Sequence, residues 1–130
     1  MMQAAHPVTI VDMEAGLEHL SRGTARHVDT LLVVVEPYFK ALEIGGRAAD
    51  LARELGIRRV LAVANKLRDA EDAAAVRACV DARNLPLAAQ VPLDEGIRRA
   101  DLAGRAPIDV ADSPAVAAIA ALARQLVEPA

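Results

Sequence analysis

The sequence has few aromatic and sulfur-containing side chains, and these shortages limit what it can bind. Tyr38 and Phe39 are the only tyrosine and phenylalanine, and there is no tryptophan. Single-stranded nucleic acids are bound largely by stacking of bases on aromatic rings, so a nucleic-acid partner of this kind is not expected. Cys79 is the only cysteine, which excludes a disulfide within the chain and a zinc site built from several cysteines.

The sequence also lacks a strong charge of one sign and a long hydrophobic run. Its formal net charge is -3, so no strongly acidic or basic surface is implied. No apolar run reaches membrane-spanning length, and the first residues, MMQAAHPVTIV, lack the basic and long apolar regions of a signal peptide. We therefore expect one soluble, cytoplasmic domain over residues 1–130, with no nucleic-acid or membrane partner.

Short apolar runs are what the sequence does have. They lack strict polar alternation, and two are rich in valine, which is typical of strands buried on both faces of a parallel sheet. The four runs that predict strands are Val8–Val11, Thr30–Val35, Arg59–Ala64 and Leu87–Val91.

Segments with helical periodicity separate these runs. An apolar stripe from Ala41 to Leu55 predicts a helix that ends at Gly56, and Asp69–Ala82 predicts another with an acidic start. Ser113 followed by Pro114 indicates the start of a last helix. Alternating strands and helices predict an α/β fold, with three layers and a mostly parallel sheet of about four strands.

Polar residues follow each predicted strand. In an open parallel sheet, ligands bind beyond the carboxyl ends of the strands, so these residues form the candidate site. They are Asp12, Glu14 and Gly16 after the first strand, Glu36-Pro37 after the second, Asn65-Lys66 after the third and Pro92-Leu93-Asp94 after the fourth.

Two groups in this set have a specific chemistry. Asp12 at the tip of an apolar strand could hold Mg²⁺ beside a phosphate chain, or equally could cap the next helix. The Asn65 amide could pair with an adenine edge while the Lys66 stem lies across the base, and the alternative is a polar strand-to-helix turn. His19 is interpreted as a hydrogen-bonded or solvated histidine, because no second metal ligand has suitable spacing.

The run VDMEAGLEHLSRGTARHVDTLLVVVEP resembles the Walker B and switch II region of CooC-type ATPases. These are nickel-insertion accessory proteins for carbon monoxide dehydrogenase, within the MinD/ParA group of P-loop ATPases. VLAVANK and VPLDEGIRRADLAGRAPIDV resemble later segments of that family in the same order. The resemblance covers essentially the whole chain and about the C-terminal half of the family.

The resemblance implies ATP or ADP with Mg²⁺ as ligands. It makes Asp12 the Walker B acid, with Glu14 and Gly16 in switch II as residues that sense the γ-phosphate. Asn65 and Lys66 would contact adenine, and Pro92, Leu93 and Asp94 would line the base pocket. A homodimer, a partner chain and carbon monoxide dehydrogenase are the partners that the family suggests.

Two parts of the family pattern are absent from this sequence. No Gly-Lys pair occurs anywhere, so the sequence has no phosphate-binding loop. It also has no Cys-x-Cys metal motif. We therefore expect this chain to need a partner or further segment that carries the loop in order to hydrolyse ATP.

In the family, the strand leading to that loop lies between the strands that correspond to Val8–Val11 and Thr30–Val35. These two runs are expected either to close up directly or to have the gap filled by another polypeptide.

Two other functions remain open from the sequence. The chain could be a non-catalytic interaction or dimerisation module derived from the family. It could instead be an unrelated receiver-like α/β domain that uses Asp12 as a phosphoacceptor, but the Asn65-Lys66 strand end and the long match around Asp12 argue against this.

Overall fold

The structure, a computed structural model, describes residues 8–13, 20–21, 23 and 26–128. Its sheet has three parallel strands in the order β1-β2-β3, with no cis peptide bond in the described chain. In chain order, the elements are β1 Thr30–Val35, α2 Phe39–Glu54, β2 Arg59–Leu67, α3 Ala70–Ala82, β3 Leu87–Pro92, α4 Glu95–Leu102, the short 3-10 helix η2 Pro107–Asp109 and α5 Pro114–Val127.

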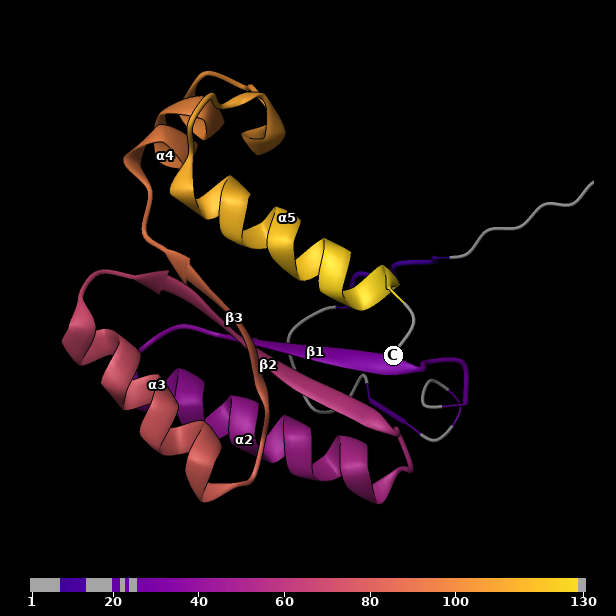
Figure 1. The fold of residues 1–130 in the computed structure, drawn as a ribbon. Helices are drawn as coiled ribbons and strands as arrows, with labels where there is room; N and C mark the ends of the chain where they lie inside the picture. The colour runs from indigo at the N-terminus through magenta and orange to yellow at the C-terminus, as the bar shows by residue number, and fades with distance from the viewer. Residues whose placement is uncertain (1–7, 14–19, 22, 24–25, 129–130) are drawn as a thin grey trace, which may run out of the picture.

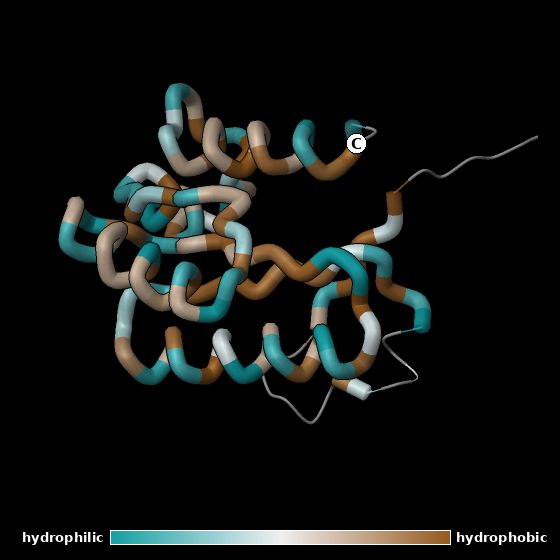
Figure 2. Tube along the Cα trace, turned by 60° about the horizontal axis from the view of Figure 1, so that its bottom comes forward, coloured by the Kyte–Doolittle hydropathy of each residue, from teal (hydrophilic) through white to brown (hydrophobic). Residues whose placement is uncertain are grey.

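Helices cover both faces of the sheet, which gives the three predicted layers. Figure 1 shows α2 and α3 on one face and α5 on the other. The hydropathy colouring of Figure 2 shows the strands as the hydrophobic centre between helices of mixed character. Because each face has its own helices, there are two hydrophobic cores: one includes Val33, Ala52 and Val76, and the other joins Val63 to Leu122.

The strands form where valine, leucine and alanine can be buried on both sides. In β2, Val60 to Ala64 are all buried, so this central strand is covered on both faces. It pairs with β1 in a continuous register, from Thr30 opposite Arg59 to Val35 opposite Ala64. The α/β class and the parallel arrangement predicted from the sequence are confirmed.

The expected fourth strand is wrong for Val8–Val11. These residues have no strand structure, and Ile10 and Val11 are 87% and 63% exposed. A strand needs hydrogen bonds from a neighbour, and β1 is paired with β2 alone among the described residues. The two apolar runs therefore do not close up directly on each other.

Helix boundaries follow the local capping chemistry that the sequence predicts. The side chain of Asp69 accepts a hydrogen bond from the backbone N–H of Asp72 at the start of α3, and Ser113 does the same for Val116 in α5. After α2, Gly56 has a φ of 89°, a left-handed value that suits glycine. Close packing of α2 on β1 depends on Gly45, where an added side chain would overlap Val35.

No helix in the described part of the chain is both long and apolar enough to cross a lipid bilayer. The longest of them, α2, has 16 residues.

Candidate functional site

The carboxyl ends of the three strands meet at one edge of the sheet. Glu36 is the first residue after β1, Asn65 and Lys66 lie near the end of β2, and Pro92 ends β3. Because the strands are parallel and adjacent, these residues lie on neighbouring positions of a single polar edge. Asn65, Lys66 and Pro92 to Asp94 are thus brought together as the sequence predicts, whereas their roles towards a nucleotide stay predictions.

Asn65 and Lys66 occupy an irregular point in the sheet. Pairing of β2 with β3 is regular at Ala64 and resumes at Leu67, with a bulge-like register shift between them. Lys66 has a left-handed φ of 57°, and its neighbour Asn65 is half-buried. Bulges reorient side chains next to binding sites, so this irregularity lets both side chains leave the regular alternation of the strand.

The Lys66 side chain reaches from the end of β2 to the end of β1. Its Nζ lies 3.2 Å from Oε1 of Glu36, and the Tyr38 hydroxyl donates to that same oxygen at 3.4 Å. Lys66 is 57% exposed and Glu36 33% exposed, so water still reaches the pair. The result is a cation, a carboxylate and a phenol gathered where β1 and β2 end.

Just beyond Lys66, Arg68 binds the start of α3. Its backbone N–H and Nε both donate to Oδ2 of Asp72, at 2.9 and 2.8 Å, and a second guanidinium N–H donates to Oδ1 at 3.0 Å. The hydrogen bonds from Arg68 lower the pKa of Asp72 to about 2 and raise the pKa of Arg68. This bidentate pair fixes the chain that leaves the bulge.

Asp94 has a structural partner set that the sequence did not predict. Its Oδ1 accepts from the backbone N–H of Gly96 at 2.8 Å, which caps α4. Its Oδ2 accepts from the Ser113 hydroxyl at 2.5 Å and from the N–H of Ala115 at 3.3 Å, which ties α4 to the start of α5. The Ser113 bond is the main cause of a lowered pKa for Asp94. The Asp94 carboxylate, directly after Pro92 and Leu93 in the chain, therefore joins α4 to α5.

Asp12 is placed away from any described cluster of ligands. It is exposed on a segment without secondary structure, and Glu14 and Gly16 lie outside the described residues. Among the residues that the structure describes, no group of three or more His, Cys, Asp or Glu side chains could hold a metal ion. Mg²⁺ often takes one or two carboxylates together with phosphate oxygens and water. The described residues do not fit a magnesium site by themselves, and Asp12 stays a predicted single ligand.

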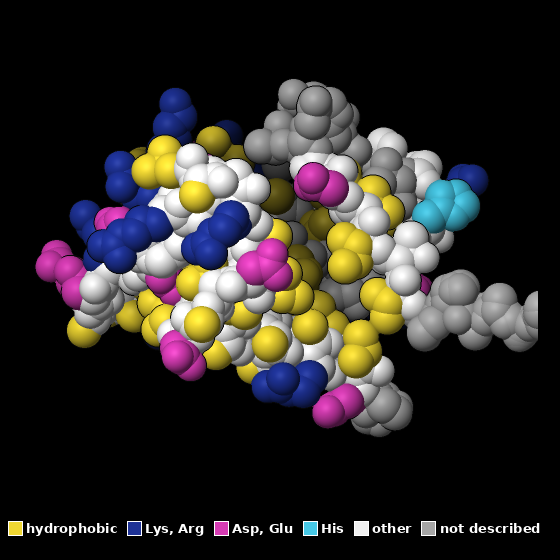
Figure 3. All heavy atoms as spheres, turned by 90° about the horizontal axis from the view of Figure 1, so that it is seen from above, with side chains coloured by type: hydrophobic (Ala, Val, Ile, Leu, Met, Phe, Trp, Pro, Cys, Tyr) yellow, Lys and Arg dark blue, Asp and Glu magenta, His cyan; other side chains and the backbone are white. Residues whose placement is uncertain are grey.

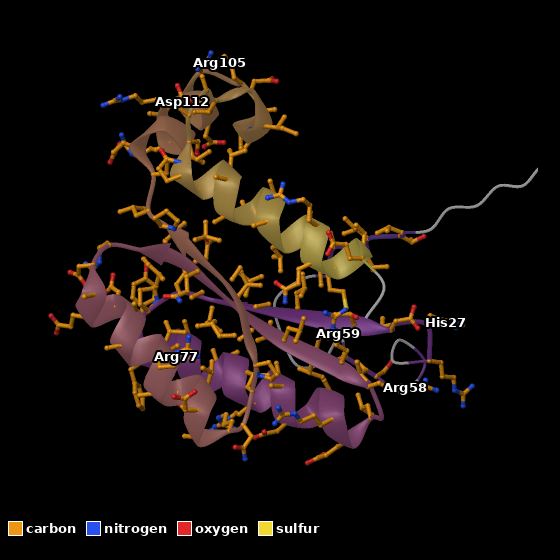
Figure 4. The ribbon with its side chains drawn as sticks, viewed as in Figure 1. His27, Arg58, Arg59, Arg77, Arg105 and Asp112 are labelled. Atoms are coloured by element: carbon orange, nitrogen blue, oxygen red, sulfur yellow. The ribbon has the colours of Figure 1, made fainter. Side chains whose placement is uncertain are left out.

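The remaining charged side chains named in Figure 4 lie elsewhere. His27, Arg58 and Arg59 lie towards the end where β1 and β2 begin, and Arg105 and Asp112 lie beyond α4. Cys79 is half-buried in α3 and its thiol donates weakly to the Leu42 carbonyl at 3.7 Å. None of these residues belongs to the edge around Asn65.

Three contributors to this edge were missed from the sequence: Tyr38, Arg68 and Asp72. Arg68 and Asp72 stand four residues apart around the start of α3, a spacing that could have suggested their pairing. For Tyr38 no comparable signal exists, because its contact depends on the turn between β1 and α2.

Comparison with known proteins now adds a second line of evidence. No family model matches the chain. The carbon monoxide dehydrogenase accessory protein CooC of Rhodospirillum rubrum is 39% identical over 106 residues, which are 82% of this chain and 39% of that protein. This chain is a homologue of CooC. An uncharacterised ATP-binding protein of Methanocaldococcus jannaschii is 35% identical over 79% of the chain and 40% of its own length.

Solved structures give the same fold. MinD of Aquifex aeolicus superposes with a TM-score of 0.66 at 22% identity, over 78% of this chain and 45% of MinD. MinD of Pyrococcus horikoshii in complex with Mg-ADP gives a TM-score of 0.63 at 22% identity, over 75% and 41%. The homologue of CooC thus has a MinD-like, P-loop NTPase-like fold. It spans about two fifths of the length of the curated relatives it matches. Homology to CooC also argues against an unrelated receiver-like domain.

Proposed function

We propose that this chain is the base-binding part of a CooC/MinD-type ATPase for metallocentre maturation. It would act with a segment or partner chain that carries the phosphate-binding loop. The observation that carries this proposal is that β1 pairs with β2 alone among the described residues, beside a polar edge formed by Glu36, Asn65 and Lys66. An apolar strand edge of this kind is a template for another strand.

The chemistry of the edge suits an adenine base. The half-buried Asn65 amide offers both a donor and an acceptor, which a purine edge can satisfy. Lys66 supplies a long apolar stem, and Pro92 and Leu93 supply apolar surface from the next strand. When bound, ATP would supply the phosphoanhydride that is hydrolysed, and the groups named here would hold only its base.

The remaining roles follow from the family. Asp12 would hold Mg²⁺ through water, and Glu14 and Gly16 would belong to the switch that senses the γ-phosphate. Carbon monoxide dehydrogenase would be the client, as the name of the Rhodospirillum rubrum relative suggests, and nickel would be the cargo, as the family resemblance implies. Because this sequence has no phosphate-binding loop, hydrolysis is assigned to the assembled protein and not to this chain alone.

Calorimetric titration of the chain with Mg-ADP tests the division of labour. Base contacts without a phosphate loop should give a dissociation constant near the millimolar range, about 4 kcal/mol. Asn65→Ala should weaken that binding, while Gln90→Ala, which removes an exposed amide on β3, is the matched control. Micromolar affinity for the chain alone would contradict the need for a second segment.

The second test asks for the loop-bearing part itself. A polypeptide with a Gly-Lys phosphate loop should co-purify with this chain, and the mixture should hydrolyse Mg-ATP when neither part does so alone. If the chain leaves ATP untouched in the presence of every such partner, the enzymatic part of the proposal fails.

The outer side of β1 also favours a second candidate function, a non-catalytic module that pairs with another copy or with a related full-length ATPase. Among the described residues β1 has a neighbour on one side only, so a copy could add its own β1 on the other side. Light scattering distinguishes the two: a dimer that excludes the loop-bearing partner favours the module, whereas a strict monomer that binds no related ATPase counts against it.

A further inference from the structure

Lys66 adopts a backbone conformation that its residue type disfavours. Three non-glycine residues in the described chain have a positive φ: Lys66, Asn84 and Asp112. Asn and Asp tolerate the left-handed region because their short polar side chains can bond locally, whereas other L-residues are disfavoured there because Cβ comes too close to the following carbonyl oxygen. Glycine would avoid this close contact. A lysine at this position therefore indicates that its side chain is used.

The surrounding chain holds this conformation in place on the C-terminal side. Leu67 pairs with Pro92, and its carbonyl accepts the backbone N–H of Leu93 at 2.8 Å. Arg68 then binds Asp72 through three hydrogen bonds. The left-handed turn is thus anchored to β3 and to α3 without any ligand, which is how strained residues persist at binding sites.

Stability alone does not explain the ion pair between Lys66 and Glu36. The two side chains are 57% and 33% exposed, and ion pairs that water reaches contribute little to stability. That contribution at best offsets the loss from the left-handed backbone. What the pair does provide is position, because it draws the lysine ammonium across to the end of β1.

We propose that Glu36 is a positioning residue for Lys66 in the base site. Glu36 anchors the ammonium at 3.2 Å, so the four-carbon stem is held between the ends of β2 and β1, where it would offer a base an apolar surface. It also balances the lysine charge, so the site takes a neutral purine ring and does not attract a phosphate. Tyr38 supports the carboxylate through its hydrogen bond to the same oxygen. This inference rests on the base site of the proposed function.

Titrations with adenosine and with ADP test the positioning role of Glu36. Binding is monitored by the NMR chemical shifts of the full chain. In Glu36→Gln the ammonium is released, so adenosine should bind about 3- to 10-fold more weakly, as expected for loss of one exposed pair plus disorder of the stem. ADP should lose less, because the freed cation now attracts its phosphates. The ratio of the two affinities therefore shifts towards ADP, whereas general damage to the fold would weaken both ligands equally.

Two further variants isolate the Glu36–Lys66 contact. Lys66→Met keeps an apolar side chain of similar reach but loses the anchor to Glu36, so adenosine should bind about 3- to 10-fold more weakly, as in Glu36→Gln. Adding Glu36→Gln to that background should then change neither affinity, because the two residues act as a pair. Glu43→Gln is the matched control: it breaks an ion pair with Arg47, 2.8 Å long, on α2. It should leave both titrations unchanged.

The outcomes separate this inference from the function on which it rests. If the wild-type chain binds no adenosine even at tens of millimolar ligand, the base site itself is wrong and Glu36 loses its role with it. If the wild type binds adenosine and Glu36→Gln binds both ligands as the wild type does, Glu36 is no positioning residue and the base site stands. Unequal effects that persist in the Lys66→Met background overturn the route through lysine.

Discussion

The two outer strands of the sheet, β1 and β3, are built differently. Each pairs with β2 alone among the described residues. Pro86 precedes β3 and Pro92 ends it, and proline lacks the N–H that would extend a sheet. In β1, TLLVVV, there is no proline or charge, and Val34 is 60% exposed. The edge of β3 is blunted against new strands, whereas that of β1 is left able to accept one.

The two strands are also held by different means. Gly45 lets α2 pack closely on one face of β1, through van der Waals contact with Val33 and Val35. β3 is covered by α5, whose start is tied to α4 by the carboxylate of Asp94. Seen from above in Figure 3, hydrophobic side chains also gather in a hollow on the α5 side of the molecule. The β1 side of the sheet therefore depends on shape, that is, on the close packing of Gly45 against Val35. The β3 side depends on a polar joint, the hydrogen bonds of Asp94 that tie α4 to α5.

The largest expected effect comes from closing the gap that Gly45 leaves. Gly45→Ala should destabilise the chain by about 2 kcal/mol, because the new methyl group would overlap Val35 in the core. Gly46→Ala is the matched control one residue away. Its methyl group would meet only the Arg83 side chain, which can move, and alanine is favoured in a helix by about 1 kcal/mol.

Urea denaturation measures both variants. If Gly45→Ala is as stable as Gly46→Ala, α2 does not hold β1 by close contact, and the shape argument for that side of the sheet fails.

A somewhat smaller loss is expected when the polar joint of the β3 side is broken. Asp94→Ala and Ser113→Ala should each lower the melting temperature by roughly 5 °C, since each removes a helix cap and the link between α4 and α5. The double variant should lose less than the sum, because both changes remove one shared hydrogen bond. Additive losses in thermal melts would show that the link itself contributes nothing.

Acid should weaken the β3 side before the β1 side. The hydrogen bond from Ser113 lowers the pKa of Asp94 below its ordinary value of 3.8. A carboxyl with a lowered pKa in the folded state stabilises the fold above the unfolded value, and this contribution is lost as the pH falls through the folded pKa. The protection of amides against exchange, relative to an unfolded chain at the same pH, should therefore fall in α4 and the first turn of α5 below about pH 4.

The Asp94 carboxylate bonds to the starts of α4 and α5 and not to β1 or α2. Amide exchange in β1 and α2 therefore provides the internal control. Loss of protection at the same pH in both regions would mean global unfolding, and Asp94→Asn should then not flatten the profile.

The smallest effect on stability is expected at the strand edges themselves. Val34→Lys and Gln90→Lys change exposed residues of β1 and β3, so each should alter stability by less than about 0.5 kcal/mol. Only Val34→Lys should abolish binding of a loop-bearing partner or a second copy, because a charged edge resists strand addition. Equal loss in Gln90→Lys would show that β3 is also an interface.

Local patterns in the sequence predicted most of the described elements closely. The strand at residues 30–35 is found as expected, and those at 59–64 and 87–91 are extended by three residues and one. The cap at Ser113 is also where expected, because a cap depends on residues two or three positions away, and the acidic start predicted at Asp69 is a cap as well. Val8–Val11 failed as a strand because its pattern says nothing about whether a neighbour is present.

The candidate site divides in the same way. The sequence alone placed Asn65, Lys66 and Pro92 to Asp94 at the ends of strands, because hydrophobic runs and their polar ends are local features. Only the tertiary structure decided that Glu36 holds Lys66, that Lys66 is left-handed and that Asp94 joins two helices. The contact of Glu36 with Lys66 forms only when β1 and β2 lie side by side, and the contact of Asp94 with Ser113, 19 positions apart, forms only when the starts of α4 and α5 meet.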